Sequence, residues 1–447
     1  MDHHTIIAKI QSFVEKELTD EVFEFVEVCN CGDIGSFEAQ LWKLVLGLYN
    51  LTAECILAES ARQVEEKLRA KARRLGLRKL ESRQVKVQIR TGHYVKVQGL
   101  YARQAPRGYQ GKRQLLSAHW KLLKAASPGY YSSVCLFGVL SPSFEVASHI
   151  LSVQGIHHNR DRVQKLCQAL GQRCKDHQAE LSRSPGETLK GKRVLIGIDG
   201  GRTRMREYTG SKNEAGNARF KTPWMEPKMF VIEVLDKHGN LDRSELPLYG
   251  CLFGDDELFD LLDQHLKGLD IDQAEQVQIV ADGAPWIWNR VKQRLLALGV
   301  SAQKIVETVD FYHASEYVHK IVAGLGGKLK KKANTILQQF KQWLWEGNIQ
   351  SIVDQCEQYF SKPNPDIKRY IGYLDKNKDR MSYQRFRDQN LVCGSGVIES
   401  GIRRVINLRF KNASAFWNPK NVEMLYFLRA TLLAFRWNIL INNLVAL

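Results

Sequence analysis

Apolar residues follow two different periods in the first part of the chain, and each period predicts a different kind of element. Over residues 1–80 they recur at three- and four-residue spacing, as between Leu41 and Leu51, which predicts amphipathic helices. Over 84–102 apolar and polar residues alternate strictly around Thr91-Gly92, which predicts a β-hairpin with a short glycine turn. The chain is therefore expected to begin with an N-terminal helical region, 1–80, that leads into a hairpin.

A helix, a glycine-containing turn and a second helix are predicted from about residue 144 to residue 166. Helical spacing runs from Phe144 to Leu151, the turn contains Gly155, and helical spacing returns after it. A DNA-binding helix-turn-helix would place Asn159, Arg160 and Arg162 at the start of its second helix, where side chains reach base edges and phosphates. An ordinary helical hairpin has the same spacing, so both interpretations stay open for this hairpin and helix-turn-helix-like region, 81–186.

After the polar segment 182–187, which contains Pro and Gly and is predicted to be a linker, the pattern changes to short β-branched runs. Strands are predicted at 194–199, 228–235, 245–249, 276–281 and 304–309, with amphipathic helices at 255–266 and 286–298. Because strands come first and then alternate with helices, the fold class is expected to be α/β (α+β mixed), with a mixed sheet packed between helices. Its first part is expected over 187–323.

The remaining third of the chain is predicted to be helical. Residues 324–390 show helical periods without a strand pattern, which predicts an all-helical insertion. Residues 391–447 are expected to return to the core and to close it with two helices, Ser400 to Lys411 and Asn421 to Leu444, the second strongly apolar.

Length and charge then narrow the class of protein. A chain of 447 residues is too long for one hydrophobic core, so several domains are expected. Lys and Arg number 65 against 48 acidic residues, a net charge of +17, which favours a polyanionic partner such as nucleic acid. No apolar stretch is expected to reach the roughly 20 residues that cross a bilayer, since Arg429 and Arg436 interrupt the C-terminal one, so no membrane partner is expected.

The cysteines and the N-terminal residues indicate in which cellular compartment the protein is expected. The nine cysteines are scattered, and only Cys29 and Cys31 lie close together, without partners at zinc spacing, so reduced thiols are expected. The first residues carry no basic region followed by an apolar one, so export is not expected. The predicted location is cytoplasmic and, for a DNA-binding protein, nucleoid-associated.

Three acidic residues carry the strongest chemical signal. Asp199 and Asp282 each end a β-branched run and precede Gly, so both are expected at strand ends that border an open site, and Glu399 begins a predicted helix. Each has a plain alternative, because Asp-Gly is a common turn and an acidic residue is favoured by the dipole at a helix start. Together they suggest a two-metal site for phosphoryl transfer.

The order of these acids resembles a known family. Asp on a first strand, Asp after a later strand and Glu on a closing helix is the pattern of DDE transposases with an RNase H-like catalytic core, which an all-helical insertion interrupts in many bacterial members. The segments Asp282 to Ile287, Asp310 to Ala314 and Gly394 to Ser400 look like those of bacterial insertion-sequence transposases of the ISKra and ISLre types. The resemblance is strongest over about 190–440 and implies an RNase H-like mixed-sheet catalytic core.

The same resemblance implies an activity. Asp199 would bridge two Mg²⁺ ions, for which Mn²⁺ would substitute, while Asp282 and Glu399 would each complete the coordination of one ion. Two such ions about 3.5–4 Å apart can stabilise the attacking and the leaving oxygens of a phosphodiester. The implied protein is a DNA transposase that binds terminal inverted repeats, cleaves and joins strands of double-stranded DNA, and acts as a homodimer or a higher homo-oligomer. Two alternatives are an inactive, transposase-derived DNA-binding protein and an RNase H-like structure-selective nuclease.

Other residues near these motifs are candidates with less definite roles. Asp310 also ends a predicted strand, and either it is an alternative metal ligand or, with His313, it supports the site from behind the ligands. The chain departs from the Tyr, Arg, Glu, Lys signature of one transposase group, because Ser395 and Ile406 occupy the Arg and Lys positions. Charge alone therefore suggests the remaining DNA contacts, which are Arg403, Arg404, Arg409 and Lys411 after Glu399, and Lys330, Lys331 and Lys332 in the insertion.

Overall fold

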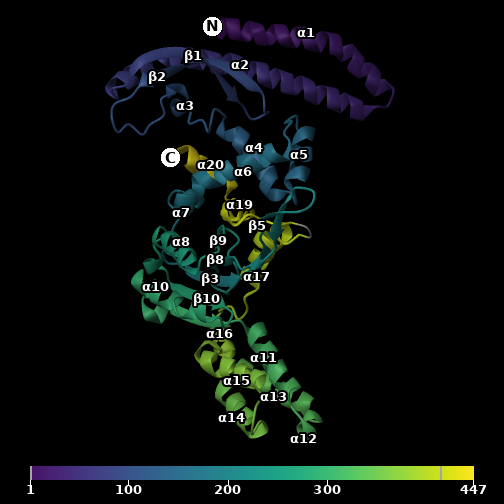
Figure 1. The fold of residues 1–447 in the computed structure, drawn as a ribbon, viewed down its shortest axis with the longest axis vertical. Coiled ribbons are helices and arrows are strands. Elements are labelled where there is room, and N and C mark those ends of the chain that lie inside the picture. Colours follow the sequence, from purple (N-terminus) through teal and green to yellow (C-terminus); the bar gives the residue numbers. More distant parts are fainter. Residues whose placement is uncertain (1–2, 413–414, 447) are drawn as a thin grey trace. The chain divides into compact units, whose positions relative to one another are not determined.

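The computed structural model describes residues 3–412 and 415–446, and the chain forms two compact units, Met1–Leu170 and Gly171–Leu447 (Figure 1). Helices are combined with a mixed five-stranded sheet, which agrees with the expected mixed α/β class.

The first unit is mostly helical and contains one β-hairpin. Its elements are α1 (His3–Asn30), α2 (Ile34–Arg74), β1 (Arg78–Gln88), β2 (Tyr94–Gln104), α3 (Leu115–His119), α4 (Pro128–Leu140), α5 (Phe144–Val153) and the start of α6 (Arg160–Cys174). The strands pair antiparallel, as expected for a hairpin, with Val85 opposite Val97, and Gly92 in the turn has a φ of 84°. The helical region that was expected to reach residue 80 stops earlier, because Gly76 takes a left-handed φ of 66° just after α2 and ends it.

The second unit is built on a five-stranded sheet whose order is β11-β10-β3-β8-β9. Its strands are β3 (Arg193–Gly200), β8 (Lys228–Leu235), β9 (Leu248–Leu252), β10 (Gln276–Ala281) and β11 (Ile305–Val309). β3, β8 and β9 form an antiparallel meander, whereas β10 and β11 run parallel to β3. All five strands were expected, although β9 begins three residues later than the predicted 245–249.

Between β3 and β8 the structure adds strands that the hydrophobic pattern does not predict. These are β4 (Thr203–Arg204), β5 (Glu207–Lys212), β6 (Ala218–Lys221) and β7 (Trp224–Met225). β4 pairs with β7, and β5 pairs with β6, so the segment leaves the sheet and returns to it as an antiparallel ribbon.

Helices complete the unit. Those before and between the strands are η1 (Lys175–His177), α7 (Gln178–Ser182), α8 (Asp255–Lys267), η2 (Ile271–Gln273), α9 (Pro285–Trp288), α10 (Val291–Ala297) and η3 (Ala302–Lys304). Those after β11 are α11 (Phe311–Ala323), α12 (Gly327–Lys330), α13 (Ala333–Glu346), α14 (Ile349–Tyr359), α15 (Pro365–Asn377), η4 (Lys378–Arg380) and α16 (Tyr383–Asp388), which Figure 1 shows grouped at one end of the unit. The chain then returns to the sheet through α17 (Gly396–Ile402), a π-helical turn η5 (Arg403–Asn407), α18 (Leu408–Phe410), α19 (Pro419–Leu433) and α20 (Trp437–Ala446).

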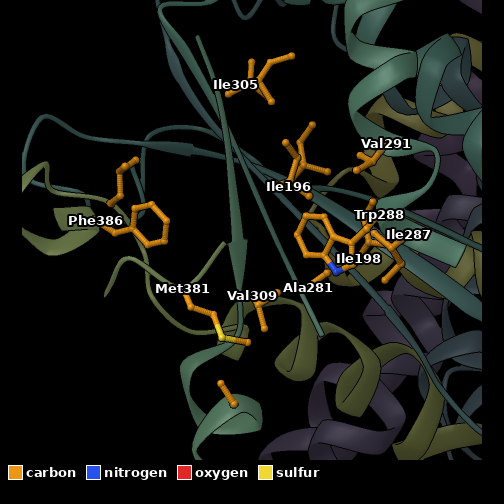
Figure 2. Packing of buried hydrophobic residues seen from close by; sticks show 14 of the residues in the cluster. Ile196, Ile198, Ala281, Ile287, Trp288, Val291, Ile305, Val309, Met381 and Phe386 are labelled. Atoms are coloured by element: carbon orange, nitrogen blue, oxygen red, sulfur yellow. The ribbon is translucent and has the colours of Figure 1, made fainter. Parts of the chain in front are cut away.

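One hydrophobic cluster joins the sheet to both groups of helices. Figure 2 shows Ile196 and Ile198 of β3 packed beside Trp288, and Met381 and Phe386 in the same cluster. These side chains are almost fully buried, so the strand ends rest on a rigid core.

A buried glutamine fixes the point where the chain comes back from the helices to the sheet. Gln278 of β10 is fully buried, its amide nitrogen donates to the carbonyl oxygen of Val392 at 2.6 Å, and its amide oxygen accepts from the Val392 N–H at 3.0 Å. The same nitrogen lies 2.9 Å from Thr308 Oγ1 on β11. This side chain therefore replaces strand pairing at a buried backbone segment.

The C-terminal apolar stretch is two helices rather than the single helix expected, because the chain turns at Phe435, whose φ is 60°. At this corner Arg436 is 1% exposed and bonds to both carboxylate oxygens of Glu187, at 2.8 and 2.5 Å. It also donates to the carbonyl oxygens of Ser182, Leu246 and Pro247. The segment 182–187, predicted to be a linker, is thus bound to the core of the second unit.

Among the described residues, α2 is long and apolar enough to cross a membrane by length and composition, since it holds an 18-residue window of mean hydropathy 1.3. The expectation that no such stretch exists is therefore wrong. α19 and α20 pass the same test only as a pair, which is bent by 117°. Only 6% of the apolar window of α2 is buried, and the helix lies near the N-terminus.

Candidate functional site

Asp199 and Asp282 are neighbours because of strand register. β3 and β10 run parallel, and Ile198 lies opposite Ala281 in their register, so the next residue of each strand is an aspartate. Adjacent strands lie about 4.8 Å apart, and the two carboxylates therefore start from neighbouring positions at the carboxyl end of the sheet. Both residues are half-buried.

Glu399 reaches the same end of the sheet through the packing of α17 on β3. A Cβ at Gly197 would lie 2.9 Å from Ile398 Cβ, so the absence of a side chain there lets the helix approach the strand. Gly401 has the same role on the helix, because a Cβ there would lie 2.9 Å from the terminal methyl group of Met229 on β8. The Glu399 carboxylate is exposed and accepts a hydrogen bond from Ser395 Oγ at 2.6 Å.

The charges of the other two acids act on Asp199. Burial raises the pKa of Asp199 to about 6, the N–H of Gly200 opposes this shift, and the negative charges of Asp282 and Glu399 add to it. The positive charge of His313 acts in the opposite direction. Carboxylates from three separate elements thus repel one another at the half-buried Asp199.

Asp310 is fully buried and lies close to Glu399. It caps the N-terminus of α11, where its Oδ1 accepts from the His313 N–H at 2.6 Å, and its Oδ2 accepts from the Ser395 N–H at 2.5 Å. Burial raises its pKa, but these hydrogen bonds outweigh burial, and the pKa of Asp310 is lowered. One carboxylate therefore joins the start of α11 to the turn that leads into the helix of Glu399.

His313 lies close to Asp310 and is 46% exposed. Its Nδ1 lies 3.7 Å from Asp310 Oδ1, and the interaction with this carboxylate, together with the charge of Asp282, raises the pKa of His313 to about 9 against the effect of burial. Ligand atoms of Asp310, His313 and Glu399 all lie within 4.8 Å of one another. Among the described residues, this is the group of metal-ligating side chains that lie close enough together to hold one ion, and it contains Glu399 but neither Asp199 nor Asp282.

A cleft of about 470 Å³ opens beside Asp282 and His313. It is lined by the segment from Asp282 to Pro285 and by residues of α11 and α15, among them the basic side chains of Arg369 and Lys376. The lining of the cleft thus combines one carboxylate of the site, Asp282, with positively charged side chains.

Two residues that hold Asp282 were not predicted from the sequence. Trp288, which is 7% exposed, donates from Nε1 to the carbonyl oxygen of Asp282 at 2.6 Å. Gly283 allows the ring of Tyr373 to lie against the backbone, because a Cβ at this position would overlap the ring. Ser395 and Gly197 were likewise missed as positioning residues. The sequence offered one usable signal, the small residues beside each acidic motif, which mark close approach.

The basic residues after Glu399 do not share one environment. Arg409 is 4% exposed, with its guanidinium 5.3 Å from the centre of the Trp417 ring, which corrects the expectation that it contacts DNA. Arg404 is half-buried and donates to Tyr249 Oη at 2.6 Å, so it too packs inward. Arg403 and Lys411 are exposed. These residues lie on successive turns of a helix that packs on the sheet. Their positive charge alone therefore did not indicate which of them face the sheet and which face outward.

The other predicted DNA contacts are accessible. Lys330, Lys331 and Lys332 are exposed between α12 and α13. In the first unit, α5 and α6 are joined by a turn in which Gly155 has a φ of 81°, and Asn159, Arg160 and Arg162 are exposed at the start of α6. Asn159 Oδ1 accepts from the Arg162 N–H at 2.9 Å and caps the helix.

Comparisons with known proteins give little beyond this geometry. No protein-family model matches the chain, and no curated protein matches it. Among solved structures, the chain is similar to the Drosophila P element transposase of a strand transfer complex, with 12% sequence identity over 68% of this chain and 78% of that one and a TM-score of 0.25. A TM-score of that size does not establish a common fold.

Proposed function

We propose that this protein is a DNA transposase of the DDE type whose second unit is an RNase H-like catalytic core. An antiparallel meander followed by two strands parallel to its first strand, in the order β11-β10-β3-β8-β9, supports this core. So does the position of the acids at the carboxyl ends of β3 and β10, where open sheets with parallel strands place their ligands. The net charge of +17 supports DNA as the substrate.

The observation that carries the proposal is that Asp199 and Asp282 follow paired positions of two neighbouring strands, while Glu399 lies on the helix that packs against the first of them. Asp199, Asp282 and Glu399 come from a strand end, a neighbouring strand end and a helix, and the charges of Asp282 and Glu399 both raise the pKa of Asp199. A protein that needed these residues only for folding would gain nothing from that repulsion. A site that binds cations turns the same repulsion into affinity.

The donor set suits divalent metal ions. Carboxylate oxygens are the ligands that Mg²⁺ and Mn²⁺ prefer, and a half-buried acid among other acids is stabilised when a cation neutralises it. Asp199, Asp282 and Glu399 would hold two such ions. When bound, the ions would stabilise the charge that develops on the oxygens of the scissile phosphodiester.

The surrounding residues prepare this group for DNA. Asp310 holds α11 and the turn before α17, which fixes the direction from which Glu399 approaches. His313, protonated at neutral pH, and the basic side chains of the adjacent cleft attract a phosphate backbone toward the acids. Ser395 holds one oxygen of Glu399 and leaves the other for a ligand.

Strand cleavage tests the proposal. The full chain is incubated with a labelled duplex that contains the DNA flanking its own coding sequence, with Mg²⁺, with Mn²⁺ or with EDTA, and the products are separated on denaturing gels. We expect cleavage that depends on the metal ion, and losses of at least about 10³-fold in Asp199→Asn, Asp282→Asn and Glu399→Gln, as for groups that stabilise a transition state. Joined products separate a transposase from a nuclease that only cuts.

Matched controls change acids of the same kind outside the site. Glu357→Gln and Asp379→Asn alter exposed side chains of the second unit and should cleave as the wild type does. Calorimetry with Mn²⁺ supplies a second readout, with uptake lost in the three site variants only. Cleavage at the wild-type rate by any of those three variants would refute the assignment of that residue.

A further inference from the structure

The ribbon that leaves the sheet between β3 and β8 has no role in the site described so far. We define the ribbon as residues 201–227, which contain β4 to β7. It extends away from the five-stranded sheet as a long hairpin (Figure 1). Its first strand begins only a few residues after Asp199, so the base of the ribbon borders the acidic group.

The outer part of the ribbon does not pack against the hydrophobic core. Every residue of β5 and of β6 is exposed, on both faces of the pair. A two-stranded hairpin of this kind is marginally stable alone and buries no apolar face. Its conformation therefore contributes little to folding, and a binding role explains its length better.

The composition of the ribbon matches a polyanion. Between residues 202 and 221 there are only two acidic side chains, Glu207 and Glu214. Six basic side chains occupy the same interval, namely Arg202, Arg204, Arg206, Lys212, Arg219 and Lys221. Arg206 is half-buried and the other five are exposed, so the ribbon carries an excess of accessible positive charge.

Aromatic rings are placed among these charges. The guanidinium of Arg204 lies 5.0 Å from the centre of the Trp224 ring, and that of Arg206 lies 4.5 Å from the centre of the Phe220 ring. Tyr208, 55% exposed, meets Phe220 edge to face at 6.2 Å between ring centres. The cation–π contacts hold two arginines in place, and the exposed rings offer flat apolar surfaces of the kind on which nucleic-acid bases stack.

The base of the ribbon is fixed firmly to the unit. Thr203 is fully buried and accepts a hydrogen bond from Tyr426 Oη at 2.8 Å, and Met205 is 1% exposed. The Arg206 N–H donates to the carbonyl oxygen of Trp417 at 2.8 Å, which joins the ribbon to the segment after α18. These contacts anchor the ribbon at its base, whereas its outer strands stay exposed.

We propose that the ribbon is a DNA-binding arm, which grips the backbone of the duplex next to the point of cleavage and presents its arginines and aromatic rings to that DNA. The proposal rests on the function proposed above and names the surface that would hold the substrate. A positive β-ribbon of this size fits the major groove of B-DNA, which admits a two-stranded ribbon.

Binding without chemistry tests the arm. Fluorescence anisotropy of a labelled duplex of arbitrary sequence is measured in EDTA at several salt concentrations, with the full chain and with the triple variant Lys212→Glu, Arg219→Glu, Lys221→Glu. If these three residues contact phosphates, the slope of log K against log salt should fall by about 2.7, at about 0.9 per contact, and affinity near 0.1 M salt should drop by at least about 10²-fold. A second variant, Tyr208→Ser, should weaken binding of single-stranded DNA by about 5-fold or more, since stacking is lost.

A control with the same change of charge is Lys237→Glu, Lys267→Glu, Lys362→Glu, three exposed lysines of the second unit outside the ribbon. It should leave the slope within about one contact of the wild type. Equal losses of affinity in both triple variants would mean that only net charge matters, and would overturn the proposal. An unchanged slope in the ribbon variant would also overturn it. So would binding of an acidic protein to the wild-type chain as strong as its binding of DNA. Because no cleavage is measured, loss of binding here stays distinct from a failure of the catalytic assignment.

Discussion

Gly197→Ala should separate Glu399 from the aspartates without removing any acid. The new Cβ would lie 2.9 Å from Ile398 Cβ and 3.0 Å from Val231 Cγ1. Ordinary carbon contacts need about 3.5–4.0 Å. The nearest atom is a Cβ rather than the end of a flexible side chain, so no rotamer change relieves the contact, and α17 has to move outward by roughly 0.5–1 Å.

Such a shift has two measurable consequences. Overpacking of this kind lowers the free energy of unfolding by about 1–3 kcal/mol. Each kcal/mol lowers the melting temperature by roughly 2–4 °C in a domain of about this size. A displacement near 1 Å at a catalytic group lowers the rate by about 10²-fold. We therefore expect a modest fall in melting temperature together with a much larger loss of metal-dependent cleavage.

The matched control lies on the same helix. A Cβ added at Gly396 would meet no atom of the described residues within 4 Å, and Gly396 has no positive φ, so Gly396→Ala should be neutral or slightly stabilising. Melting is followed by circular dichroism and cleavage on the duplex used above. If Gly197→Ala melts and cleaves as the wild type does, the packing of α17 on β3 does not position Glu399, and the argument from geometry fails.

Three further changes probe other parts of the second unit. Glu187→Gln leaves Arg436 buried without its charge partner and should cost about 3–5 kcal/mol in urea unfolding at pH 7. Because the pKa of Glu187 is lowered in the folded state, the wild type loses this advantage as the pH falls below about 4.5, and a difference that does not shrink there would contradict the pairing. Asp199→Asn should raise the melting temperature in EDTA at pH 7, since burial and neighbouring acids raise the pKa of Asp199 to about 6, and should abolish any further rise with Mn²⁺; unchanged melting in EDTA would argue against the repulsion. Gln278→Leu leaves the N–H and carbonyl groups of Val392 without partners and should cost about 2–5 kcal/mol by the same unfolding assay, whereas a cost below about 1 kcal/mol would mean that another group replaces the amide.

The strands of the sheet could be predicted because their apolar residues form short β-branched runs. The ribbon escaped the same reasoning, since β5 and β6 are exposed on both faces and show no alternation of apolar and polar residues. The C-terminal helix was predicted as one element because nothing in its local pattern marks the turn at Phe435. That turn depends on the partners of Arg436, which lie about 190 and 250 residues away in the chain.

The sequence by itself determined the mixed α/β class, the strands that carry Asp199 and Asp282, and the chemical types available for a site, because local periodicity and residue chemistry are properties of short segments. Tertiary structure alone decided which groups meet. The register of Ile198 against Ala281 makes the two aspartates neighbours, and the contact between Gly197 and Ile398 brings α17 to them. It also turned Arg409 inward while Arg403 stays exposed. Burial of a charge depends on packing between distant segments, and no local pattern records it.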